Sequence, residues 1–165
     1  MSMSTPTVLL CAAALVALAG EARAQTVTKK ALTLEGAKAV AAAAVAEARR
    51  GNEGGSIAIV DDGGNLMYLE RVEPTFPMGA HISIEKARTA ALFQRPSKVL
   101  EDAIIGGRSS LLAVVPGPLQ GGEPITVDGQ IVGAVGVSGA ASAARDQAIA
   151  LAGAAALGGK SSASK

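Results

Sequence analysis

The chain has 165 residues, and its 15 Lys and Arg nearly balance 14 Asp and Glu, which leaves a formal net charge of +1. Nucleic-acid binding needs concentrated positive charge and aromatic stacking, and aromatic residues make up only 2% of this chain, so that class of function is excluded. The single cysteine, Cys11, excludes disulfides within the chain and metal centres held by several cysteines.

The first 24 residues have the pattern of an export signal. An apolar run over residues 8–20 is followed by Ala22-Arg23-Ala24, which fits an Ala-x-Ala cleavage sequence. The run is too short to span a bilayer, which takes about 20 residues. An uncleaved anchor is the alternative, because no Lys or Arg precedes the run. Cleavage near Ala24 would give a periplasmic or secreted protein with no transmembrane segment.

One domain is predicted over residues 25–159, and a disordered tail over residues 160–165. Residues 34–50 are predicted to form a helix, with Thr33 as its N-cap. Two strands follow over residues 56–60 and 66–71, joined by an Asp-Asp-Gly-Gly-Asn loop that suits a hairpin.

A second helix is predicted over residues 80–94, after a turn region that contains two prolines. Its face toward the sheet is expected to carry Ala80, Ile84, Ala87 and Ala91. Pro96 ends this helix, and Ser97 is predicted to cap a short one over residues 98–105.

Three strands complete the predicted sheet. The first covers residues 111–115, and the other two form a hairpin around Asp128-Gly129, a pair suited to a tight turn. The last strand is apolar on both faces, which is typical of the centre of a sheet. A closing helix is predicted over residues 142–157. Because hairpins dominate, the expected class is α+β with a mainly antiparallel sheet.

His81 is the only histidine, and it limits every catalytic or metal-binding scheme. No Gly-x-Ser-x-Gly nucleophile elbow is present, which argues against covalent hydrolysis. His81 and Glu85 are four residues apart on one helical face, where a weak divalent metal site and a solvated pair of side chains are the two alternatives.

A haem site requires fewer protein ligands than such a metal site: one axial donor, an apolar slot, and cations or hydroxyls for the propionates. The candidate donors are His81, Met78, Met67 and Tyr68. The helix after His81 carries a stripe made of Ile82, Lys86, Thr89 and Phe93. Such a stripe suits a pocket that faces propionates, but it is more often a partly exposed helix face.

Three segments together resemble the GlcG/HbpS-like haem-binding family. They are residues 57–66 (IAIVDDGGNL), residues 84–93 (IEKARTAALF), and residues 118–140, which include PLQGGEPI and VGAVGVSGA. The resemblance implies a profilin-like three-layer α/β/α sandwich with a central five-stranded sheet, and self-assembly into homo-oligomers. Members of this family include exported haem-binding proteins and domains appended to a corrinoid adenosyltransferase. Glu123 departs from the family pattern, which usually has an apolar residue there.

The leading hypothesis is an exported protein that sequesters or buffers haem without obvious catalytic turnover. His81 is the predicted axial ligand of the haem iron, and Met78 is the alternative donor. Lys86 and Arg88 are expected to compensate the propionates, and Phe93 to add apolar contact.

Two other classes of function stay open. In one, the protein is an accessory protein or enzyme that acts on a small carboxylic-acid metabolite; Lys86 holds the carboxylate, and Glu85 or Asp146 moves a proton. In the other, the protein is a structural subunit without a ligand, and the helix stripe lies in a subunit interface.

Overall fold

The computed structural model describes residues 26–158, so the predicted signal peptide and C-terminal tail lie outside the described part of the chain. The elements in chain order are α2 (Leu34–Arg50), β1 (Gly55–Asp61), β2 (Leu66–Val72), α3 (Gly79–Phe93), α4 (Ser97–Ile105), the 3₁₀ helix η1 (Ser109–Ala113), β3 (Gly122–Val127), β4 (Gln130–Ser138) and α5 (Ala143–Gly158). No helix within these residues is both long and apolar enough to cross a bilayer.

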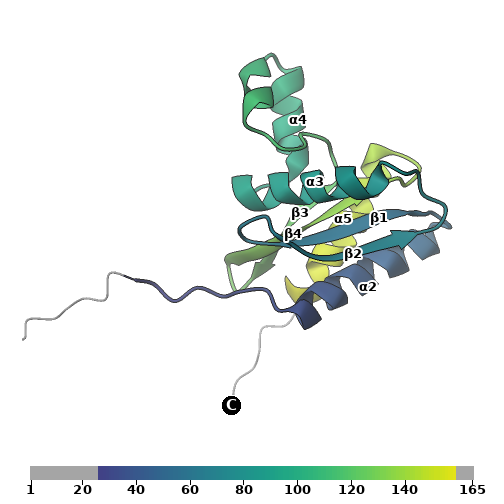
Figure 1. Ribbon diagram of the computed structural model, residues 1–165, viewed down its shortest axis with the longest axis horizontal. Helices are drawn as coiled ribbons and strands as arrows, with labels where there is room; N and C mark the ends of the chain where they lie inside the picture. The colour runs from purple at the N-terminus through teal and green to yellow at the C-terminus, as the bar shows by residue number, and fades with distance from the viewer. Residues whose placement is uncertain (1–25, 159–165) are drawn as a thin grey trace, which may run out of the picture.

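The four strands form one sheet in the order β2-β1-β4-β3, and every neighbouring pair is antiparallel (Figure 1). This confirms the α+β class, the two hairpins and the central position of β4. Helix α2 begins as predicted, because the Thr33 hydroxyl accepts a hydrogen bond from the Gly36 backbone N–H at 3.1 Å.

The prediction of a fifth strand over residues 111–115 is wrong for the described chain. These residues fall in η1 and the turn after it, where the Val115 N–H donates to the Leu111 carbonyl at 2.9 Å. Such local hydrogen bonds use the backbone groups that a strand would offer to a neighbour. A short apolar run fits a strand and a helical turn equally well by periodicity, and here the local turn forms.

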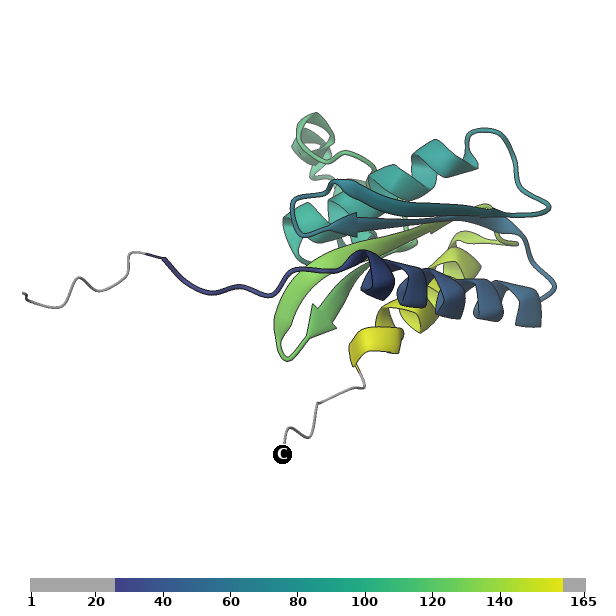
Figure 2. The ribbon, with the colours of Figure 1, turned by 60° about the horizontal axis from the view of Figure 1, so that its bottom comes forward.

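Helices cover both faces of the sheet, which gives three layers (Figure 2). Helices α2 and α5 pack on one face and α3 packs on the other. The face toward α2 and α5 carries large side chains, including Ile57, Ile59 and Val135. On the face toward α3, Val60 of β1 is joined by small residues of β4: Ala134 belongs to the cluster beneath α3, and Gly136 has no side chain at all.

Small residues let α3 lie directly on the sheet. A Cβ atom at Gly136 would be 2.0 Å from the Ser83 carbonyl oxygen, so the helix backbone touches the strand there. This contact also changes which side of α3 is buried. Ala87 and Ala91 are buried as predicted, whereas Ala80 and Ile84 are only half-buried, and Ser83 occupies the buried position instead.

Candidate functional site

His81 lies in the first turn of α3 and contributes to a cavity of about 350 Å³. The cavity is lined by Met78, His81, Ile82, Glu85, Pro116, Gly117, Pro118 and Leu119. One wall is therefore the start of α3, and the other is the loop that precedes β3. The lining is mainly apolar, and the volume falls at the lower end of the range of about 300–1,000 Å³ for small-molecule pockets.

Two potential iron donors lie at the mouth of this cavity. His81 is exposed, and Met78, at the N-cap position of α3, is 57% exposed. The other two candidates are elsewhere, because Met67 and Tyr68 pack against the core between the sheet and helices α2 and α5. The structure thus brings together His81 and Met78 and separates them from Met67 and Tyr68.

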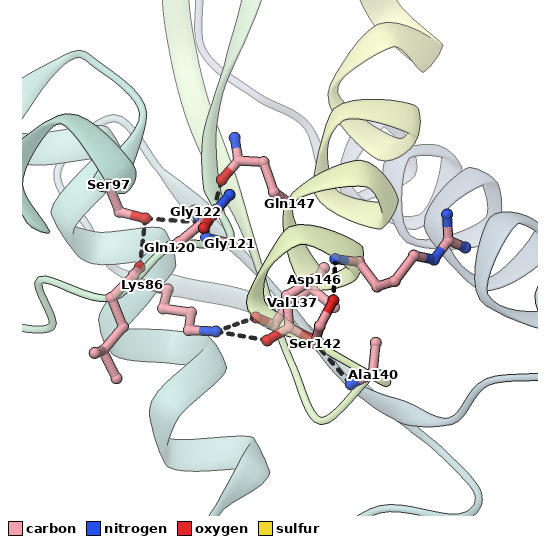
Figure 3. Close-up of polar contacts among 12 residues, drawn as sticks. Lys86, Ser97, Gln120, Gly121, Gly122, Val137, Ala140, Ser142, Asp146 and Gln147 are labelled. Atoms are coloured by element: carbon pink, nitrogen blue, oxygen red, sulfur yellow. Dashed lines mark hydrogen bonds and ion pairs between the residues drawn. The ribbon is translucent and has the colours of Figure 1, made fainter. Parts of the chain in front are cut away.

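The loop wall, residues 116–119, is held by two buried hydroxyls. The Thr89 hydroxyl donates to the Gly117 carbonyl at 3.0 Å and accepts from the Gly117 N–H at 2.9 Å. The Ser97 hydroxyl donates to the Leu119 carbonyl at 2.6 Å and accepts from the Gly122 N–H at 2.9 Å (Figure 3). Ser97 therefore ties the loop to α4, and it does not act as the predicted N-cap, a position that Pro96 occupies without a side-chain hydrogen bond.

Lys86 belongs to α3 but is not among the residues that line the cavity. It is 4% exposed, and its ammonium donates to the Asp146 carboxylate at 2.8 Å and to the Val137 carbonyl at 2.9 Å (Figure 3). The second oxygen of Asp146 accepts from the Ala140 N–H at 2.9 Å. This buried ion pair joins α3, the end of β4 and the start of α5. The Lys86 ammonium is therefore buried in a structural ion pair and is not exposed to bind a propionate or a substrate carboxylate.

Arg88 stands one turn beyond the cavity and is tied to its edge. Its guanidinium pairs with the Glu85 carboxylate at 2.7 Å and donates to the Gly64 carbonyl at 3.1 Å. Because Glu85 is a lining residue, Arg88 is the predicted cation that the fold does hold near the cavity.

Phe93 is at the opposite end of α3 from His81. Twelve residues separate them along the helix, which is about 18 Å at 1.5 Å per residue. The structure therefore does not bring Phe93 to the cavity. Sequence periodicity placed Phe93 on one stripe with Ile82, Lys86 and Thr89, but it could not show that the cavity covers only the first two turns of α3.

A metal site made of side chains alone is not present in the described residues. Within residues 26–158, no group of three or more His, Cys, Asp or Glu side chains lies close enough to hold an ion. His81 and Glu85 supply two such side chains at the cavity, so the weak divalent site considered for this pair lacks further ligands.

Two further cavities lie away from His81. One, of about 410 Å³, is an apolar groove between the N-terminal segment and the end of α5, with Leu32, Val132 and Leu157 among its residues. The other, of about 440 Å³, is polar and includes Arg49, Arg71 and Glu73. Neither contains a predicted haem ligand.

Comparisons with known proteins by sequence and by structure point to one family. The model of a family described as "Haem degrading protein HbpS-like" matches residues 32–155. Protein GlcG of Escherichia coli strain K12 is 47% identical over 112 residues, which cover 67% of this chain and 84% of GlcG. The crystal structure of a double mutant of Streptomyces reticuli HbpS has a TM-score of 0.75 and 32% identity, and the match covers 84% of this chain and 95% of that one. The crystal structure of a PduOC:haem complex, at 24% identity, has a TM-score of 0.69 over 77% of this chain and 95% of that one, a likeness in fold.

Proposed function

The chain belongs to the HbpS-like family, and from this premise we propose that it binds haem and sequesters or buffers it without turnover of its own. The observation that carries the proposal is the mainly apolar cavity with an imidazole and a thioether at its mouth. Haem binding needs an apolar slot and one axial donor, and these residues supply both. In this proposal His81 is the axial ligand of the haem iron, and Met78 is the alternative donor.

The charged residues around the cavity limit which groups could compensate the haem propionates. No Lys or Arg is among the lining residues, and Lys86 is buried in its pair with Asp146. Haem propionates would therefore find no cation among the lining residues, and Arg88 would be the neighbouring cation. The apolar lining of α3 and the loop wall would hold the uncharged part of the macrocycle.

Export and self-association belong to the same proposal. Export is supported by the apolar run over residues 8–20 and the cleavage sequence after it. Homo-oligomer formation is supported by exposed apolar side chains on α4, η1 and the residue after it, namely Val99, Ile105, Leu112 and Val114. Exposed apolar groups that gather on one part of a surface are typical of interaction sites.

A hemin titration tests the proposal. Protein that begins at residue 25 is titrated with hemin while the Soret band is recorded, and the same is done with His81→Ala and Met78→Leu. We expect a saturable Soret shift for the wild type, a weaker and displaced band for His81→Ala, and an almost unchanged band for Met78→Leu.

Each other outcome has a definite meaning. No Soret shift with the wild type would refute haem binding, and an unchanged band in His81→Ala would refute only the axial assignment. Because the family description refers to haem degradation, the complex is also followed under air with ascorbate. Steady loss of the Soret band with release of iron would contradict buffering without turnover.

A further inference from the structure

We infer that Thr89 is the positioning residue that holds the loop wall against α3 beside His81, and that the apolar cavity kept in this way accepts the uncharged part of a porphyrin ring. The inference rests on the proposed function, since it concerns how the same cavity selects its ligand. Thr89 itself is fully buried and is absent from the cavity lining. Its effect must pass through Gly117.

The contact between Thr89 and Gly117 fixes the two peptide groups on either side of the Gly117 Cα atom. One hydroxyl accepts from the N–H and donates to the carbonyl of the same residue, at 2.9 and 3.0 Å. Two bonds to one residue define both its distance from α3 and its orientation. Leaving these backbone groups unpaired inside the protein would carry a desolvation penalty, so the loop stays in this position.

The remainder of the loop leaves little room for adjustment. Pro116 and Pro118 flank Gly117, and each has a fixed φ angle. A Cβ atom at Gly117 would lie 2.6 Å from the Glu85 Cβ, so the loop already rests on the helix at this point. Ser97 holds the far end of the loop through Leu119. Between these points, the hydrogen bonds that hold Gly117 to α3 are the two with Thr89.

The chemistry of the slot follows from its walls. Helix α3 forms one side and a proline-flanked loop forms the other, and the distance between them is set at Gly117. The lining is mainly apolar and its one carboxylate, Glu85, is paired with Arg88. A ligand held here therefore meets an apolar surface whose one carboxylate is already paired, which favours an uncharged, apolar part of the ligand.

A matched pair of variants tests this role. Thr89→Val keeps the shape of the side chain and removes the hydroxyl, whereas Thr89→Ser keeps the hydroxyl and removes the methyl group. Binding is measured with hemin and with metal-free protoporphyrin IX, which needs the slot but no axial ligand. Hydrogen exchange of the Gly117 amide reports the loop without any ligand. Val135→Ala, on the opposite face of the sheet, controls for a general loss of stability.

We expect Thr89→Val to weaken protoporphyrin IX and hemin binding about tenfold and to expose the Gly117 amide to exchange, while Thr89→Ser stays within about twofold of the wild type. Val135→Ala should lower the melting temperature and leave porphyrin affinity unchanged.

Equal porphyrin affinity in Thr89→Val and the wild type would overturn the inference and leave haem binding intact. If the wild type binds protoporphyrin IX but not hemin, the proposed haem function fails and the inference is still decided by Thr89→Val. If the wild type binds neither, both fail.

Discussion

Glu123 gives the sharpest prediction about stability. It lies on β3, is 5% exposed, and is paired in register with Val135, so its side chain faces the large-residue core beneath α5. Burial raises the pKa of the Glu123 carboxyl from 4.5 to about 7. The charged form is thus disfavoured in the folded protein, and Glu123→Gln, which stays neutral, removes this penalty.

The size and direction of the effect follow from linkage. Each unit of pKa shift corresponds to about 1.36 kcal/mol, so the ionised carboxyl costs at most about 3 kcal/mol, and less where water reaches the group. Because the folded protein holds the Glu123 proton more tightly than the unfolded chain, the contribution to stability is fully present below about pH 4.5 and is lost as the pH rises through about 7. The free energy of unfolding should therefore fall with rising pH across this window.

Urea unfolding at pH 5, 6, 7 and 8 measures the effect. We expect Glu123→Gln to be more stable than the wild type by less than about 1 kcal/mol at pH 5, and by up to about 3 kcal/mol at pH 8. Glu35→Gln is the control, because the Glu35 side chain is 84% exposed and should not change the slope between pH 5 and 8. The same pH slope in Glu123→Gln as in the wild type would refute the reasoning. The carboxyl of Asp61 does not affect this comparison: burial acts to raise its pKa, but hydrogen bonds from Asn65 and Gly63 outweigh burial and lower the pKa from 3.8, outside this window.

Two further predictions concern charge. Lys86→Met should lower the free energy of unfolding, measured in urea, by about 3–5 kcal/mol, because it leaves the Asp146 carboxylate buried without its cation. The double variant with Asp146→Asn should recover part of this loss. A loss below about 1 kcal/mol for Lys86→Met would show that the pair is not buried in solution. Hemin dimethyl ester, which lacks the propionate charges, should bind with an affinity within about threefold of that of hemin in the Soret titration, because no cation lines the cavity. A hundredfold loss of affinity would place the propionates against a cation.

Local sequence signals predicted the elements whose boundaries depend on near neighbours. The Thr33 cap, the Asp128-Gly129 turn and the apolar run of β4 each have a local cause, and the structure has α2, the second hairpin and a central β4. The prediction of a strand over residues 111–115 was wrong because an apolar pattern alone does not distinguish a strand from a local helical turn.

The site was predictable only in part. His81 and Met78 are close because they are three residues apart at the start of one helix, and sequence alone indicates that. The second wall depends on contacts between distant residues, since Thr89 and Gly117 are 28 positions apart. The burial of Lys86 depends on Asp146, 60 positions away, and helical periodicity carries no information about that pair. Helical periodicity therefore could not distinguish a cation that stabilises the fold from one that binds a ligand.

The position of the bound haem tests the central claim most directly. Paramagnetic hemin broadens nearby amide signals in NMR spectra, and zinc protoporphyrin IX serves as the diamagnetic reference. The account predicts that the amides of Ile82 and Gly117 broaden first, while that of Val135 on the opposite face of the sheet stays sharp. Broadening centred on Leu32 and Leu157, at the other apolar groove, or no broadening at all, would contradict haem binding beside His81.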